Sequence, residues 1–429
     1  MNTEETIATD KAHLWHPFTQ HQEWCAPGYD PLVIVSAEGA LLRDSEGRDY
    51  IDGNSSIWTN LHGHRHPRID AAIRAQLEQA AHTSFLGFTH PLAAELAREL
   101  VALFPPNTLS RVFFSDNGST AIEVALKMAA QFWQQTGQPK RTRFVAFSGA
   151  YHGDTMGASS LGGIPAFHDR FSAWQFPAGR AGTLQELKEM DSSVLAAVVI
   201  EPLIQGAAGM RLWPKGMLAE LRDWCDAEGV LLILDEVMTG FGRTGTMFAC
   251  EQESVIPDFI ALAKGLTGGY LPLAATLTTE RIFAAFLGGP ERTLYYGHSY
   301  TANALGCAAA LASLAIFREE EVLEQLQRKI ALLGRLLANL GRRPRVMEVR
   351  QCGFIAGIEV GWNAGEPFAP GQLVGAKVCL AARRHGLLTR PIRDTIALML
   401  PYCITESQIR RAVDGLTRAI DEACPVRQG

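Results

Sequence analysis

The sequence has 429 residues, which is long enough for a large hydrophobic core and for two or three domains. It is 47% hydrophobic and 20% charged, the composition of an ordinary globular protein. The net charge is −6, and no block of basic residues occurs. Nucleic acid and anionic membrane surfaces are therefore not the expected partners.

Three features bear on the cellular location. The N-terminal sequence MNTEETIATD is polar and acidic, unlike a secretory signal or a basic transit peptide. No uncharged apolar stretch is long enough to span a bilayer. Eight cysteines are scattered along the chain without a C-x-x-C pair. We expect a reduced, cytoplasmic protein outside the membrane, with mostly buried thiols.

The N-terminal region combines an aromatic segment with a group of short strands. Residues 11–30 are rich in Trp, His and Pro without a clean period, which predicts an irregular segment. Such dense aromatics favour packing against a site or a second subunit, or a simple hydrophobic clamp for the N-terminus. Residues 33–35, 40–43 and 50–52, separated by EG and SEGR turns, predict an antiparallel meander.

The segment GNSSIWTNLHGHRHP follows the meander and contains three alternating histidines, His62, His64 and His66. Histidines invite a metal interpretation, but no Cys or carboxylate pattern accompanies them, and their spacing is not that of a familiar ligand set. We therefore expect no metal here and interpret the segment as a loop that lines a site.

The next strand and helix form a candidate anion site. Residues 91–104 first predict an amphipathic helix with proline in its opening turn. The strand RVFFS then leads into DNGSTAIEVALKMAAQFW, whose apolar residues follow the helical period, with Ser119 placed as the N-cap. The turn at Gly118 and Ser119 would present N–H groups and a positive dipole end to an anion such as phosphate. The alternative is an ordinary capped helix.

Strands and helices continue to alternate. Residues 143–147 predict a strand followed by SGAYHGDT, where Tyr151 is placed either to stack on a flat heteroaromatic ring or to serve as an ordinary turn residue. Residues 194–200 predict a strand that ends at Glu201, and residues 215–228 predict a helix. This alternation predicts an α/β fold with a mostly parallel central sheet and helices on both faces.

Two further strands end in charged residues. Residues 231–234 and 259–263 are short and uniformly apolar, which predicts strands buried on both faces. Asp235 and Lys264 follow them, at the carboxyl ends where open α/β sheets bind ligands. A lysine that forms a Schiff base and an acid that keeps a pyridine nitrogen protonated are what pyridoxal phosphate chemistry requires. The alternative is a solvated turn lysine and a helix-capping aspartate.

A glycine pattern suggests a different cofactor. Gly240, Gly242 and Gly245 fit the G-x-G-x-x-G fingerprint of dinucleotide-binding sites. The glycines begin five residues beyond Asp235, however, and TMFACEQ after them does not open a convincing helix. A nicotinamide site is therefore the less favoured interpretation.

The pattern changes in the last third of the chain. A hydroxyl-rich loop leads into a long helix of small residues, suited to close packing, and residues 321–340 predict an amphipathic helix. Strands at 346–349 and 354–360 follow, then a helix, the strand ALMLPY and a last helix with Thr405 and Gln408 as its capping box. We expect a large domain (61–330) and a smaller α+β domain (331–429) that residues 1–60 join.

Ten motifs spread along the chain resemble class III, fold-type I, pyridoxal phosphate-dependent aminotransferases: HLWHPFT, DGNSSIW, HGH-x-HP, SDNGSTAIEVALKMA, AYHGDT, IEPLIQGAAGM, DEVMTGFGRTG, AKGLTGG, GHSYTAN and LTRP. The resemblance covers nearly the whole chain. It implies that Lys264 carries the cofactor and moves a proton, and that Asp235 pairs with the pyridine nitrogen. His298 and Ser299 would reach the phosphate of a neighbouring subunit, which implies a homodimer. The implied cofactor-binding residues are Gly118, Ser119, Tyr151, Asp235, Lys264, His298 and Ser299.

The resemblance also implies a substrate site. Its positions are Phe18, Ile57, Trp58, Tyr151, Gly297 and Arg390. Arg390 suits a carboxylate because its guanidinium can bind bidentately. The implied reaction is a ping-pong transfer of an amino group, from S-adenosylmethionine to 8-amino-7-oxononanoate in biotin biosynthesis.

Two positions depart from the family pattern. Ile57 stands where the family often has Trp, and Phe18 stands where it often has Tyr; a branch with similar replacements uses L-lysine as the donor. The same fold would also suit a different ω-amino or amino-ketone acid as the substrate, or a binding protein without catalytic activity. The intact Lys264 and Asp235 count against a binding protein.

Overall fold

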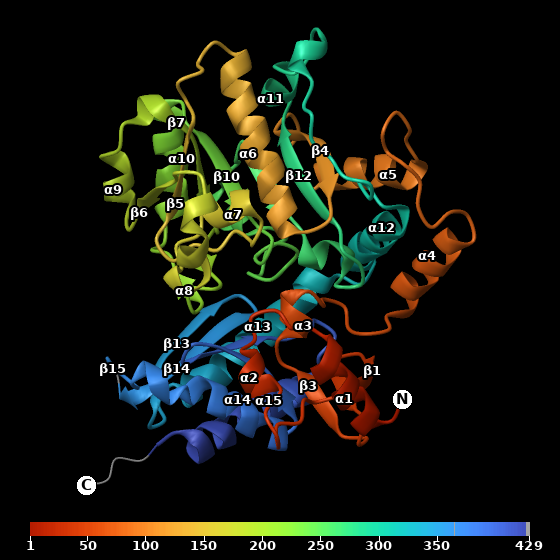
Figure 1. Cartoon of the computed structure of the whole chain (residues 1–429), viewed down its shortest axis with the longest axis vertical. Coiled ribbons are helices and arrows are strands. Elements are labelled where there is room, and N and C mark those ends of the chain that lie inside the picture. The colour runs from red at the N-terminus through yellow and green to blue at the C-terminus, as the bar shows by residue number, and fades with distance from the viewer. Residues whose placement is uncertain (364, 426–429) are drawn as a thin grey trace.

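The computed structural model describes residues 1–363 and 365–425 (Figure 1). A large sheet with its helices fills the upper half of the view in Figure 1, and smaller sheets with their helices fill the lower half. The N-terminal elements lie in the lower half, beside the C-terminal ones.

The large sheet has seven strands in the order β4-β12-β11-β10-β7-β5-β6. Only β12 runs antiparallel to its neighbours β11 and β4, and the pairs from β11 to β6 are parallel. The mostly parallel sheet expected from the alternation of strands and helices is thereby confirmed. Its strands are β4 (Leu109–Ser115), β5 (Arg143–Phe147), β6 (Gly179–Ala181), β7 (Leu195–Ile200), β10 (Leu231–Asp235), β11 (Phe259–Leu262) and β12 (Ala274–Thr279).

Helices cover both faces of this sheet, which explains its uniformly apolar strands. All residues of β7, β10 and β11 are buried. Along β10, Leu231 and Ile233 join one hydrophobic cluster while Leu232 and Leu234 join the other. Each strand therefore needs apolar side chains at every position rather than at alternate ones. The covering helices include α5 (Pro91–Val101), α6 (Gly118–Gln135), α10 (Met217–Glu228) and α12 (Ala304–Glu319).

The N-terminal meander joins the C-terminal part of the chain in a shared sheet. Its strands pair antiparallel as predicted, and β3 then pairs in parallel with β16 near the C-terminus. We propose on this basis that residues 1–60 and 331–429 form one domain beside residues 61–330. The strands of the shared sheet are β1 (Ile34–Glu38), β2 (Leu41–Asp44), β3 (Asp49–Asp52) and β16 (Leu387–Leu388).

The C-terminal sheet has five antiparallel strands backed by helices, with α15 packed on α13 and α14. The final helix begins at the predicted capping box of Thr405 and Gln408. These elements are β13 (Val346–Cys352), β14 (Ile355–Asn363), β15 (Glu366–Pro367), β17 (Arg390–Ile392), β18 (Thr395–Met399), α13 (Val322–Leu340), α14 (Val374–Arg384) and α15 (Glu406–Ala423).

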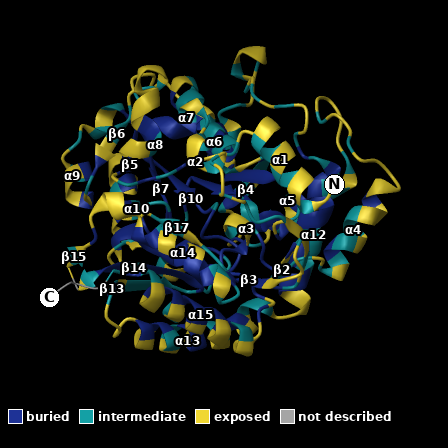
Figure 2. Ribbon diagram, turned by 60° about the horizontal axis from the view of Figure 1, so that its bottom comes forward, coloured by how far each residue is buried: buried dark blue, intermediate teal, exposed yellow. Residues whose placement is uncertain are grey.

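The predicted irregular segment from residue 11 is partly wrong, because helix α1 (Thr3–His13) includes its first three residues. No residue of α1 is buried, as its yellow and teal colouring in Figure 2 illustrates, and a capping box of Asn2 and Glu5 begins it. A helix without an apolar face leaves no helical period in the sequence. Within the described ranges, no helix combines the length and apolarity needed to cross a membrane.

The remaining elements are short or connect the sheets. They are α2 (His21–Trp24), α3 (Ser55–Trp58), α4 (Pro67–Leu77), α7 (Met156–Ser160), α8 (Pro165–His168), α9 (Leu184–Lys188), α11 (Glu280–Ala284), β8 (Ile204–Gln205), β9 (Arg211–Leu212), and the 3-10 helices η1 (Asp169–Trp174), η2 (Ser192–Val194), η3 (Ala249–Glu253), η4 (Lys264–Thr267), η5 (Pro290–Arg292) and η6 (Pro370–Gln372).

Gly353, in the turn between β13 and β14, fixes the contact between the two parts of the chain. Its φ is +59°, and an added Cβ would lie 2.2 Å from the Thr244 carbonyl carbon. We predict that Gly353→Ala lowers the free energy of unfolding by more than about 2 kcal/mol, because it combines left-handed backbone with a clash against main chain. Urea unfolding measures this loss.

The control is Gly47→Ala, at a glycine with φ +82° and open space around its Cβ position. Gly47→Ala should lower the free energy of unfolding by only about 1 kcal/mol, because only the left-handed backbone is unfavourable there. Equal losses at the two positions would show that the contact with Thr244 contributes nothing.

Candidate active site

Adjacent parallel strands bring Asp235 and Lys264 to the same edge of the large sheet. Asp235 ends β10 and pairs with Ala261 of β11, and Lys264 begins η4 just beyond β11. Burial lowers the pKa of Lys264, while the charges of Asp235 and Glu201 oppose that effect. The amine is therefore neutral more often than a surface lysine, which favours attack on a carbonyl.

Both oxygens of Asp235 accept hydrogen bonds. His152 Nδ1 lies 2.7 Å from Oδ2, and the Val237 N–H donates to Oδ1 at 3.1 Å. Asp235 is only 5% exposed, and these donors offset the loss of water around its charge. His152 was not predicted as a site residue from the sequence, although it follows Tyr151 in one of the motifs.

Glu201 is a second buried carboxyl group beside this pair. It follows β7, and its oxygens accept the backbone N–H groups of Tyr151 at 3.2 Å and Gly206 at 2.9 Å. Burial, with a smaller contribution from the charge of Asp235, raises the pKa of Glu201 to about 7, whereas His152 opposes the shift. From the sequence, Glu201 was predicted only to end a strand, with no role in the site.

The start of α6 lies beside the same strand ends. A Cβ on Gly118 would lie 2.7 Å from Val237 Cγ1, so only glycine allows this close approach. The prediction that Ser119 caps the helix is wrong: α6 begins at Gly118, and Asn117 forms the capping box with Thr120. The Ser119 hydroxyl instead accepts the Asp154 N–H at 3.1 Å.

Tyr151 connects this helix start to the aromatic N-terminal segment. Its hydroxyl donates to Asp154 Oδ2 at 2.5 Å, and burial raises its pKa. Its ring contacts Phe167, 6.1 Å between centroids, and Phe167 contacts the largely exposed Phe18 at 5.4 Å. Phe18 is thus connected to Tyr151 through the Phe167 ring, which contacts both.

Trp58 is a predicted substrate residue that lies close to Lys264. The Lys264 Nζ lies 4.8 Å from the centre of the Trp58 ring, and the indole N–H donates to Asn54 Oδ1 at 2.7 Å. Ile57 precedes it and is 45% exposed. The Trp58 ring therefore forms a hydrophobic wall beside the Lys264 amine.

Four other predicted residues lie on two further elements, one on a strand and three in one loop. Arg390 is exposed on β17. His298 Nδ1 lies 3.3 Å from Asp116 Oδ2, just before α6, and Ser299 and Gly297 flank it in the same loop. Within the single chain, this loop therefore approaches the start of α6.

The three alternating histidines have separate partners. His62, predicted to line a site, is instead buried: its Nε2 lies 2.9 Å from Ser313 Oγ, and burial lowers its pKa to about 3. His64 pairs with Asp52 at 3.1 Å, and His66 lies 3.7 Å from Glu320. Across residues 1–363 and 365–425, no group of three His, Cys, Asp or Glu side chains could hold a metal ion.

The segment with the glycine fingerprint follows β10 as a loop, and hydrogen bonds to Glu236 hold it in place. The buried carboxylate of Glu236 accepts the N–H groups of Ala249 and Cys250, both at 2.9 Å, and the Thr239 hydroxyl at 2.7 Å. The segment after the glycines forms the 3-10 helix η3 rather than an α-helix. A dinucleotide fingerprint requires a helix start at this point, so the nicotinamide interpretation is not supported.

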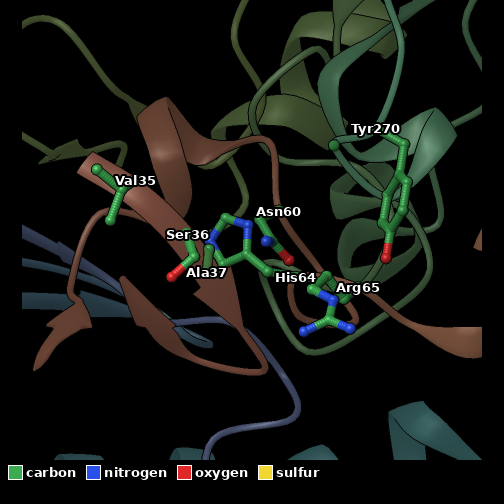
Figure 3. A pocket seen from close by; sticks show the side chains of 8 residues that line it. Val35, Ser36, Ala37, Asn60, His64, Arg65 and Tyr270 are labelled. Atoms are coloured by element: carbon green, nitrogen blue, oxygen red, sulfur yellow. The ribbon is translucent and has the colours of Figure 1, made fainter. Parts of the chain in front are cut away.

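A cavity of about 530 Å³ lies beside the meander (Figure 3). Val35 lies at one end of the view and Tyr270 at the other, with His64 between them. None of the predicted cofactor or substrate residues lines it. We therefore locate the candidate active site from the buried charged groups rather than from this cavity.

The mostly parallel sheet, with a lysine and a buried aspartate at adjacent strand ends, is the arrangement expected of a fold-type I aminotransferase. The sequence profile of the family "Aminotransferase class-III" matches residues 24–420, and the chain belongs to this family.

Relatives agree over almost the full length. The chain is 48% identical to the adenosylmethionine-8-amino-7-oxononanoate aminotransferase of Nitratidesulfovibrio vulgaris, covering 96% of this chain and 80% of the relative. It is 45% identical to the enzyme of the same name from Geobacter sulfurreducens, covering 96% of both.

Solved structures agree with the fold. The same-named enzyme of Methanocaldococcus jannaschii superposes with a TM-score of 0.95 at 39% identity, covering 99% of this chain and 100% of the other. An (S)-enantioselective omega-transaminase from Thermomicrobium roseum gives 0.94 at 33% identity, with the same coverage.

Glu201 makes stability depend on pH. Its pKa is raised from 4.5 to about 7 by burial, so its contribution to stability is fully present below pH 4.5 and is lost as the pH rises through 7. Glu201→Gln stays neutral. We predict that the free energy of unfolding of the variant, relative to that of the wild type, rises from pH 5 to pH 8 by about 3 kcal/mol at most.

Urea unfolding at both pH values measures this gain. Parallel pH dependence in the two proteins would show that Glu201 is not held neutral by burial.

Proposed function

We propose that the chain uses pyridoxal phosphate to transfer an amino group to 8-amino-7-oxononanoate, giving 7,8-diaminononanoate, with S-adenosylmethionine as the donor. The pairing of Lys264 with the buried Asp235 at adjacent strand ends carries the proposal. The names of relatives 48% and 45% identical over nearly the whole chain support the substrate and the donor. We place this reaction in the cytoplasm, in keeping with the free cysteines of the described residues.

The side chains at the strand ends fit this cofactor. Pyridoxal phosphate supplies an aldehyde and an electron-withdrawing ring. Lys264 would bind the aldehyde through its amine and carry the proton during transfer, and the Asp235 carboxylate would hold the ring nitrogen. The start of α6, with Gly118 and Ser119, would bind the phosphate through backbone N–H groups and the helix dipole. Tyr151 would lie against the ring.

The proposed substrate residues would surround the Lys264 amine. Trp58 and Ile57 would contact the apolar chain of the acceptor, together with Phe18 and Gly297. Arg390 would bind its carboxylate through the planar guanidinium. The binding of a carboxylate by an arginine far from the amine would orient the reacting end toward Lys264.

The amino donor is the point at which this chain departs from the family pattern. Ile57 and Phe18 replace an aromatic ring and a phenol hydroxyl, so the pocket for the donor is more aliphatic. Both side chains are partly exposed and can shift without opening a buried void. We therefore retain S-adenosylmethionine as the proposed donor, with L-lysine as the alternative.

A homodimer is the proposed assembly. Leu86, Phe88, Tyr295 and Tyr300 are 58–83% exposed, and a contact between His82 and Tyr300 brings their two segments together. Exposed apolar patches of this kind are typical of protein interfaces. His298 and Ser299 lie in the second segment, where a partner subunit's cofactor site would be within their reach.

The donor is tested on the purified protein loaded with pyridoxal phosphate. We predict that S-adenosylmethionine removes the yellow absorbance band of the bound cofactor, and that 8-amino-7-oxononanoate restores it. Lys264→Ala should lower turnover at least about 10³-fold, because both the covalent attachment and the proton carrier are lost. Lys329→Met, at another lysine whose pKa is lowered by burial, is the control and should keep the activity.

Bleaching by L-lysine alone would assign the chain to the lysine-using branch. A protein that never binds the cofactor would disprove the role of Lys264.

The assembly is tested by light scattering. The chain has a mass of 46.8 kDa, and we predict a particle of twice that mass. Tyr295→Glu should shift it toward the monomer, because a buried charge opposes association. Trp174→Glu, at an exposed aromatic of η1 outside the patch, should leave the dimer intact. A wild-type particle of 46.8 kDa contradicts the homodimer.

A further inference from the structure

Four consecutive residues, the last of which is Trp58 of the active-site wall, have left-handed backbone. Ser55, Ser56, Ile57 and Trp58 have φ values of 43°, 47°, 66° and 67°. None is glycine, and left-handed backbone is unfavourable for every other residue type, most of all for a β-branched one such as Ile57. Such a turn persists only when its surroundings hold it, and strained backbone of this kind is concentrated at functional sites.

Asp52, at the end of β3, is the residue that holds the middle of this turn. Its side chain is nearly fully buried, and its two oxygens accept the Ser56 N–H at 2.9 Å and the Ser56 hydroxyl at 2.8 Å. His64 Nε2 lies 3.1 Å from the second oxygen and fixes the carboxylate from the other side. Hydrogen bonds to an ionised group are about twice as strong as those between neutral groups.

A second contact fixes the start of the turn to the C-terminal sheet. The Ser55 hydroxyl donates to the carbonyl of Met399, the last residue of β18, at 2.7 Å. The Met399 N–H in turn donates to the Gly53 carbonyl at 2.9 Å. The turn is therefore held at its base, and its other end, where the Trp58 indole bonds Asn54, presents the Trp58 ring to Lys264.

We propose that Asp52 is a positioning residue for the active site: its carboxylate keeps Ser55–Trp58 left-handed and thereby holds the Trp58 ring against Lys264. Loss of the carboxylate lets Ser56 and Ile57 return to right-handed or extended backbone, which redirects their side chains and withdraws the ring. That Trp58 forms a substrate wall rests on the proposed function, whereas the conformation of the turn does not.

Asp44 provides a matched control in the same meander. It is also a nearly fully buried carboxylate, and it accepts hydrogen bonds from Arg48 Nε at 2.7 Å and the Tyr50 hydroxyl at 2.8 Å. These partners all lie in its own hairpin, with none in the turn. Asp44→Asn therefore removes a buried charge from the sheet without touching Ser55–Trp58.

The experiment compares Asp52→Asn with Asp44→Asn in the cofactor-loaded protein. For Asp52→Asn we expect the KM for the amino acceptor to rise at least about tenfold, as for the loss of a hydrogen bond to a charged group, with a smaller change in kcat. For Asp44→Asn we expect KM within about twofold of the wild type. A crystal structure of Asp52→Asn should show Ser56 or Ile57 outside the left-handed region and Trp58 displaced from Lys264.

Two results would overturn the proposal: an Asp52→Asn crystal structure with the four φ values and Trp58 unchanged, or an equal rise in KM for the two variants. If Asp52→Asn fails to fold, Ser56→Ala removes only the hydroxyl bond and should raise KM in the same direction by about threefold, while an unchanged KM would count against the proposal. If no variant and no wild type accepts 8-amino-7-oxononanoate, the proposed function fails, and the crystal structures still decide the role of Asp52.

Discussion

The active site depends on the energetic cost of removing charge from water. Asp235, Glu201 and Lys264 all lie at the carboxyl ends of three adjacent strands, where little solvent reaches them. An isolated buried charge is costly, so each group must be compensated by hydrogen bonds or by an opposite charge. His152 and Val237 compensate Asp235, and the backbone of Tyr151 and Gly206 compensates Glu201. These partners fix the loops after the strands, so the loop conformations follow from the charges they surround.

The sheet itself was largely predictable from the sequence. Strands such as Leu231–Asp235 are apolar at every position because α6 and α10 cover opposite faces, and such a run leaves few other interpretations. The prediction of parallel strands also placed Asp235 and Lys264 at one edge of the sheet, since neighbouring parallel strands end at the same edge. The helix cap two residues before Ser119 was missed because Asn117, Ser119 and Thr120 all have capping side chains, and local sequence does not rank them.

Long-range contacts account for what the sequence could not predict. His152 reaches Asp235 across 83 positions of the chain, and no local pattern marks a buried histidine as the partner of a distant carboxylate. The left-handed turn runs against local preference, since Ser-Ser-Ile-Trp contains neither glycine nor asparagine, and each such residue costs roughly 1–2 kcal/mol. The bond from Ser55 to Met399 spans 344 positions, so one of the contacts that hold the turn leaves no trace in the local sequence.

The turn of Ser55–Trp58 also links two parts of the molecule mechanically. Its base is hydrogen-bonded to the last residue of β18 in the C-terminal sheet, while its end lies against Lys264, just beyond the central sheet. A rigid, strained turn transmits displacement better than a flexible loop, because it has no neighbouring conformation of similar energy to absorb the movement. A rotation of the C-terminal sheet against the central sheet would therefore shift the indole ring relative to the Lys264 amine, so that the position of the ring is coupled to the angle between the two sheets.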